Sequence, residues 1–134
     1  MIVSLDSPAG VTPPSGPYSH VARIDIGGGG ALLFLAGQIA VDDAGAIVGE
    51  GDMAAQARRI FDVIGGILAA HGAGFGDVVH IRTFVTDLGL LPDYGRVRRE
   101  LFPGVPPAST TVEVSRLFRP GALLEVEVTA AVGT

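Results

Sequence analysis

The amino-acid sequence predicts an α+β fold, in which one mixed sheet carries two helices on one face. Two observations lead to this prediction. Residues 53–71 place apolar side chains on one stripe at helical spacing, and residues 90–102 form a second helical segment. Five further segments have the alternation or the β-branched content of strands, which gives the order β-β-α-β-α-β-β. Few helices among many strands favour a sheet with both helices on one side.

The first half of the chain is predicted to begin with a loop and a hairpin. Residues 7–17 are dense in Pro, Gly and Ser, a composition typical of loops. Residues 19–26 and 31–35 are expected to be strands, joined by the consecutive glycines at 27–30. These glycines could also form a phosphate-binding loop. Neither a Lys-Ser/Thr pair nor a helical pattern follows them, so we favour the hairpin.

The longer helix and the second half of the chain follow. Asp52 is the expected N-cap of this helix, and Gly72 suits the position just after its last turn. A strand, the second helix and two more strands come next, at residues 77–86, 90–102, 108–115 and 123–132. With a length of 134 residues, we expect a single domain spanning residues 1–134.

Alternation along the later strands separates apolar from polar side chains. The apolar faces, which we expect to pack against the helices, comprise Val79, Ile81, Val85, Thr110, Val112, Val114, Leu124, Val126, Val128 and Ala130. The opposite face is expected to carry the polar groups Arg82, Ser109, Thr111, Glu113, Glu125 and Glu127. Such a face either meets water or forms a polar subunit interface that holds a site.

The composition disfavours several classes of function. The chain has no cysteine, and its three histidines lack a metal-binding spacing, so we expect no metal and no cofactor. A net charge of −5 disfavours nucleic acid as a partner. No apolar run reaches the roughly 20 residues that cross a bilayer, and the N-terminus lacks the pattern of a signal peptide. We therefore expect a cytoplasmic protein without a membrane partner.

Several short motifs occur together in a recognisable order. They are Ser15-Gly16-Pro17-Tyr18-Ser19, Leu35-Ala36-Gly37-Gln38-Ile39, Gly76-Asp77-Val78-Val79, Thr83-Phe84-Val85-Thr86-Asp87-Leu88 and Pro106-Pro107-Ala108-Ser109-Thr110-Thr111-Val112-Glu113-Val114. Each motif is weak alone, but the set covers most of the chain. The sequence resembles the Rid family of reactive-intermediate deaminases, also called YjgF-like.

The resemblance implies a chorismate-mutase-like fold and a homotrimer with three clefts between its subunits. In deaminating members of the family, each cleft binds a small imine or enamine made from an amino acid. An arginine holds the substrate carboxylate, and a glutamate positions the water that attacks the imine carbon. The products are a keto acid and ammonia.

Carried over residue by residue, the resemblance makes Glu125 the water-positioning catalytic residue. Tyr18 and Gly37 match positions that line the cleft. Ser109 stands where the deaminating members have the carboxylate-binding arginine, and Thr111 stands at a position often held by cysteine. Purely structural roles stay open, because Glu125 could face solvent or an interface arginine and Tyr18 could simply pack.

Two further positions bear on the missing arginine. Gly95 stands where some deaminating members have an asparagine in the cleft. Arg82, expected on the same sheet face as Glu125, could supply the lost positive charge to a ligand. Alternatively, Arg82 forms an ion pair with Glu113 or Glu127 and stabilises the sheet.

The sequence thus leaves two functions in view. The first is a Rid-like small-molecule cleft that hydrolyses an imine, enamine or related metabolite and releases ammonia, on a substrate unlike the standard amino-acid imines. The second is a non-catalytic metabolite-binding or regulatory trimer of the same fold. An endoribonuclease, a label that some relatives carry, is disfavoured by the acidic composition and the absence of tryptophan.

Overall fold

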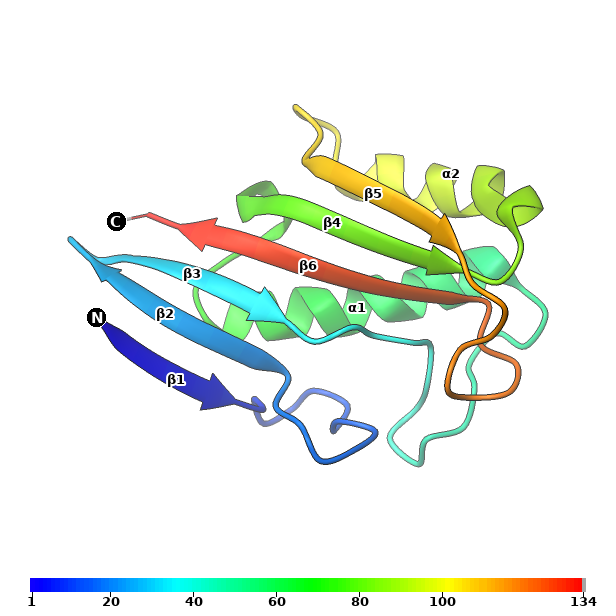
Figure 1. The fold of residues 1–134 in the computed structure, drawn as a ribbon, viewed down its shortest axis with the longest axis horizontal. Coiled ribbons are helices and arrows are strands. Elements are labelled where there is room, and N and C mark those ends of the chain that lie inside the picture. The colour runs from blue at the N-terminus through cyan, green and yellow to red at the C-terminus, as the bar shows by residue number, and fades with distance from the viewer. Residues whose placement is uncertain (134) are drawn as a thin grey trace.

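Six strands form one sheet in the order β1-β2-β3-β6-β4-β5, with two helices on one face (Figure 1). The computed structural model describes residues 1–133. The strands are β1 (Ile2–Asp6), β2 (Val21–Gly27), β3 (Gly30–Leu35), β4 (Val78–Val85), β5 (Ala108–Glu113) and β6 (Leu124–Val132). The helices are α1 (Met53–Ala70) and α2 (Leu91–Leu101), each preceded or followed by short turns. All neighbouring strands are antiparallel except β4 and β5, which are parallel.

The longer helix begins and ends where the sequence predicted. The Ala55 backbone N–H donates to Asp52 Oδ1 at 3.0 Å, so Asp52 caps α1. His71 follows the last helical residue, and Gly72 adopts the left-handed conformation at φ 73° that stops the helix. Neither helix within residues 1–133 is both long and apolar enough to span a membrane.

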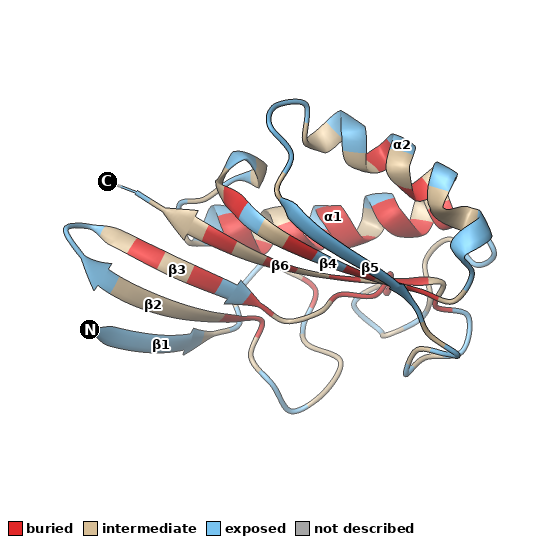
Figure 2. Ribbon diagram, turned by 45° about the horizontal axis from the view of Figure 1, so that its top comes forward, coloured by how far each residue is buried: buried red, intermediate tan, exposed pale blue. Residues whose placement is uncertain are grey.

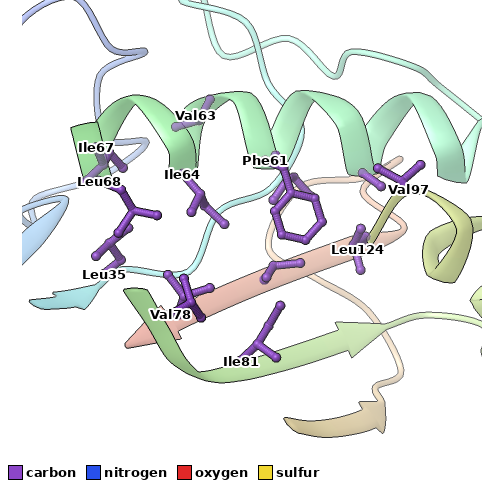
Figure 3. Close-up of a cluster of buried hydrophobic side chains, with 14 of the residues drawn as sticks. Leu35, Phe61, Val63, Ile64, Ile67, Leu68, Val78, Ile81, Val97 and Leu124 are labelled. Atoms are coloured by element: carbon purple, nitrogen blue, oxygen red, sulfur yellow. The ribbon is translucent and has the colours of Figure 1, made fainter. Parts of the chain in front are cut away.

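The core lies between α1 and the sheet (Figure 3). From the helix, Phe61, Ile64 and Leu68 point toward the sheet, where they meet Ile81 of β4 and Leu124 of β6. All five side chains are fully buried. Because burying a large apolar side chain contributes roughly 1.5–3 kcal/mol, this layer supplies the main force that holds the helix to the sheet.

The shorter helix is attached through Tyr94. Its ring stacks on Phe61, with ring centroids 6.2 Å apart, and its hydroxyl lies 2.8 Å from Thr83 Oγ1 of β4. Burial raises the pKa of Tyr94, so the phenol stays protonated and available for this hydrogen bond. These contacts hold α2 against the helix side of β4 and β5, where α2 forms one wall of a cavity.

The sequence did not predict β1. This strand pairs with β2, and its side chains are almost all exposed (Figure 2). A strand that buries neither face leaves no alternation of polar and apolar residues to detect. The end of β1 is tied to the end of α1, because His71 Nε2 lies 2.9 Å from Asp6 Oδ2.

The predicted faces are confirmed for β6, where Leu124, Val126, Val128 and Ala130 are buried against the helices. The prediction for Val79 is wrong, because a register irregularity between Val78 and His80 turns Val79 outward.

The predicted facing of β5 is also wrong. Its register sets Ser109 beside Ile81, Thr111 beside Thr83 and Glu113 beside Val85. Paired residues on neighbouring strands point to the same face, so these three polar side chains lie on the helix side, not with Arg82. The reason is that β5 is an edge strand with all residues exposed, so no buried set fixes its phase (Figure 2).

Candidate functional site

The free face of the sheet, opposite the helices, carries a small group of charged residues on its central strands. Glu125 and Glu127 of β6 point to this face and lie beside Phe84 and Arg82 of β4. Arg82 forms an ion pair with Glu127. Of the two roles that the sequence left open for Arg82, the ion pair is therefore the arrangement found.

Glu125 makes no hydrogen bond or ion pair to any group of residues 1–133, unlike its neighbour Glu127. Burial, and after it the charge of Glu127, raises the pKa of the Glu125 carboxyl above its ordinary value. A half-buried carboxylate without a partner is unusual, because partial burial of an unpaired charge costs stability. These properties make Glu125 a candidate for a group that exchanges protons with a ligand.

Gly37 is the residue that lets Glu125 lie where it does. A Cβ atom at position 37 would overlap the Glu125 carboxylate and approach its Cγ to 3.2 Å. The backbone of Gly37 does not have a positive φ, so the requirement for glycine here is space and not conformation. The structure thus brings together Gly37 and Glu125, which sequence reasoning had selected separately.

The segment around Gly37 is held by hydrogen bonds on both sides. Gln38 and Val126 exchange two backbone hydrogen bonds of 2.9 and 3.0 Å, which fixes the segment against β6 directly beside Glu125. On the other side, the Ala36 N–H donates to the His20 carbonyl at 2.8 Å. The position of Gly37 is therefore set by the sheet and by the start of β2.

His20 and Gln38 form a buried link that the sequence reasoning missed. His20 Nε2 lies 2.6 Å from the Thr12 carbonyl, and Gln38 Nε2 lies 3.2 Å from His20 Nδ1. Because a carbonyl only accepts, Nε2 carries the ring hydrogen and Nδ1 accepts from the amide. Both side chains are buried, and together they connect the loop at 7–20 to the Gly37 segment. The only feature of the sequence that could have indicated this link is a histidine placed directly before a strand.

Tyr18 lies in that loop and is 43% exposed. The Ser15 backbone N–H donates to its hydroxyl at 3.2 Å. The ring is thus held by its own loop, and much of its surface is free for contact with another molecule.

Ser109 and Thr111 lie on the helix side of the sheet, away from Glu125. Thr111 lines a cavity of 330 Å³ between β5 and α2, whose helix wall includes Gly95, Arg98 and Arg99. The sequence predicted Ser109 and Thr111 on the same face of the sheet as Glu125, but they lie on the opposite face. A larger cavity of 690 Å³, formed mainly by the connection between β5 and β6, contains none of the predicted site residues. No three metal-binding side chains cluster within residues 1–133.

Comparison with known proteins identifies the family. A family model described as Endoribonuclease L-PSP matches residues 10–132. The chain belongs to the Rid (YjgF-like) family. The fold predicted from the resemblance is thereby confirmed, since solved Rid structures superpose on nearly the whole chain.

Three relatives illustrate this Rid membership. Protein DfrA of Myxococcus xanthus is 40% identical over 86% of this chain and 85% of its own. The 3-aminoacrylate deaminase RutC of Acinetobacter baylyi is 32% identical over 89% of this chain and 90% of its own. The crystal structure of YyfA, a Rid protein from Yersinia pestis, is 30% identical with a TM-score of 0.85, over 98% of this chain and 100% of its own.

Proposed function

We propose that this Rid protein is a trimer whose inter-subunit clefts hydrolyse a small imine or enamine and release ammonia. The observation that carries the proposal is the Glu125 carboxylate, which has no partner among residues 1–133, has a raised pKa and lies against Gly37. The family resemblance assigns the same residue the task of positioning water.

The reaction needs one base and one water molecule. The Glu125 carboxylate accepts a proton from the water as the water oxygen attacks the carbon of the protonated imine, or of the protonated imine form of an enamine, which gives a neutral tetrahedral aminoalcohol. Glu125 then returns this proton to the nitrogen, the C–N bond breaks as the hydroxyl group loses its proton to solvent, and a carbonyl compound and ammonia leave. A raised pKa suits this role, because the carboxyl must both take up and release the proton near neutral pH.

The opposite facing of the two residue groups supports a site between subunits. Tyr18, Gly37 and Glu125 would form one wall, and Ser109 and Thr111 of a neighbouring copy would form the other. Apolar side chains left open on the free face of the sheet also favour burial against another copy. Phe34 is 43% exposed and Val112 is 41% exposed. Arg82 is the weaker candidate for a ligand contact, because Glu127 already balances its charge.

A serine at position 109 cannot form the bidentate contact that an arginine makes with a carboxylate. The substrate is therefore expected to differ from the standard amino-acid imines of the family, unless another part of the cleft supplies the positive charge. The alternative is a binding or regulatory trimer that keeps the cleft without the chemistry.

The test is release of ammonia and carbonyl product from freshly generated 2-aminoacrylate, 3-aminoacrylate and bulkier imines. The wild type should exceed the spontaneous rate, and Glu125→Gln should lose about a hundredfold or more of that excess. Glu100→Gln is the matched control, since Glu100 lies on α2 and its one ion-pair partner within residues 1–133 is Arg58. No excess rate on any substrate would overturn the proposal, and tight binding of a compound without conversion would favour the regulatory alternative. Light scattering should give the mass of three 13.7 kDa chains.

A further inference from the structure

Two arginines of α2 line one cavity, and no ion pair in the described part of the chain balances their charges. The chain has nine basic residues, all of them arginine. Five of these form ion pairs, namely Arg23, Arg58, Arg59, Arg82 and Arg96. The other four form none within residues 1–133: Arg116 and Arg119 line the 690 Å³ cavity, and Arg98 and Arg99 line the 330 Å³ cavity. The 330 Å³ cavity also contains Thr111, a predicted site residue, which makes its two positive charges without a counter-charge the candidates for a ligand contact.

The helix directs both arginines over Gly95. Positions 95, 98 and 99 are three and four residues apart, so they share one side of α2. A methyl group at position 95 would lie 3.3 Å from Arg99 Nη1, which shows that this guanidinium extends across the glycine. Arg98 lies near the Tyr94 hydroxyl, where it offsets part of the rise in the pKa of Tyr94 that burial causes.

The rest of the cavity is suited to a small organic anion. Among the described residues no Asp or Glu lines it, so no carboxylate in its wall neutralises the arginines. Leu91 and Phe102 supply apolar surface, and Thr111 adds a hydroxyl. A volume of 330 Å³ lies at the small end of ligand sites, which favours a compact carboxylate with a short apolar part over a nucleotide.

We propose that Arg98 and Arg99 bind the carboxylate of the ligand, in place of the arginine that the family resemblance expects at position 109. The anion site has moved from β5 to α2, while Thr111 stays on its wall. The guanidinium groups supply paired donors to the two carboxylate oxygens. This inference rests on the proposed function, because it takes the cavity between β5 and α2 as the part of each inter-subunit cleft that the neighbouring subunit supplies.

Binding of pyruvate and of its uncharged analogue pyruvamide, measured by calorimetry on the full-length protein, tests the assignment. The wild type should bind pyruvate at least tenfold more tightly than pyruvamide. The double variant Arg98→Gln/Arg99→Gln should bind pyruvate about ten- to a hundredfold more weakly, with pyruvamide binding unchanged. Arg99→Gln alone should show part of the loss, and it leaves the Tyr94 surroundings intact. Arg96→Gln is the matched control on the same helix and should stay within twofold of the wild type.

The outcomes separate this inference from the proposed function. Equal binding of the two compounds, no binding of pyruvate, or pyruvate binding that survives the double substitution would each overturn the carboxylate site. Glu125→Gln should keep pyruvate binding even though it loses turnover. If no imine is hydrolysed but pyruvate binding depends on Arg98 and Arg99, the proposed hydrolysis fails and the carboxylate site stands.

Discussion

Replacing Gly37 by alanine is predicted to disable the proposed site without weakening the fold. The added Cβ would overlap the Glu125 carboxylate and lie 3.2 Å from its Cγ, so the carboxylate must swing away from the segment at 36–38. The backbone at position 37 accepts alanine, and a glycine-to-alanine change at such a position stabilises a protein by about 0.4–1 kcal/mol through the unfolded state. A displacement of about 1 Å in a reacting group can lower turnover about a hundredfold.

Two measurements follow this change. Thermal melting should show a midpoint equal to or above that of the wild type, while imine hydrolysis falls about a hundredfold. NMR titration of the Glu125 carboxyl should show its pKa falling back toward the ordinary glutamate value, because the displaced carboxylate becomes more hydrated. The titration needs no substrate and so tests the geometry by itself.

A double-mutant cycle decides whether the effect passes through Glu125. In a Glu125→Ala background the alanine at position 37 has no carboxylate to displace, so it should cost no further activity. The reasoning is refuted if Gly37→Ala keeps wild-type turnover and an unchanged Glu125 pKa, or if the two substitutions lower activity independently.

Three further predictions concern stability, measured by urea unfolding at one fixed protein concentration. Gln56→Leu should cost about 3 kcal/mol, because the buried amide donates to the carbonyls of Gly49 and Gly121 and accepts from Leu123 N–H; a loss below 1 kcal/mol would contradict this. Asp52→Ala should cost about 1 kcal/mol by removing the cap of α1, whereas Asp52→Asn should cost much less. Glu125→Gln should stabilise the protein at neutral pH and lose this gain below the ordinary glutamate pKa. The surroundings that raise the Glu125 pKa destabilise the folded protein only when this carboxyl is ionised. A gain in stability that persists at acidic pH, where the carboxyl is protonated, would therefore have a different cause.

The sequence predicted those parts of the fold whose local signals agree with burial. The helix from Met53 to Ala70 has a cap, a continuous apolar stripe and a terminating glycine, and all three are confirmed. The hairpin of β2 and β3 is also confirmed. The prediction missed β1 and assigned the wrong facing to β5, and both errors have the same cause. Both strands lie at the edges of the sheet, where exposure removes the pattern that reveals a strand or fixes its phase.

The candidate site was predictable only as separate residues. Motif resemblance selected Gly37 and Glu125, but their contact across the isolated pairing of Gln38 with Val126 is a tertiary fact. Ser109 was assigned to the wrong face, because the phase of an exposed strand cannot be read from alternation. Nothing in the local sequence marks Arg98 and Arg99 as site residues, and they became candidates because they line the cavity between α2 and β5.

The placement of Glu125 and Thr111 on opposite faces of the sheet has a genetic consequence. In the proposed trimer, each cleft takes one wall from each of two adjacent chains, so defects in the two walls can complement one another. A ring that mixes Glu125→Gln chains with Arg98→Gln/Arg99→Gln chains always contains a junction where both contributing walls are wild type. Co-expression of two inactive variants would therefore restore activity in part, and the two walls could change independently during evolution.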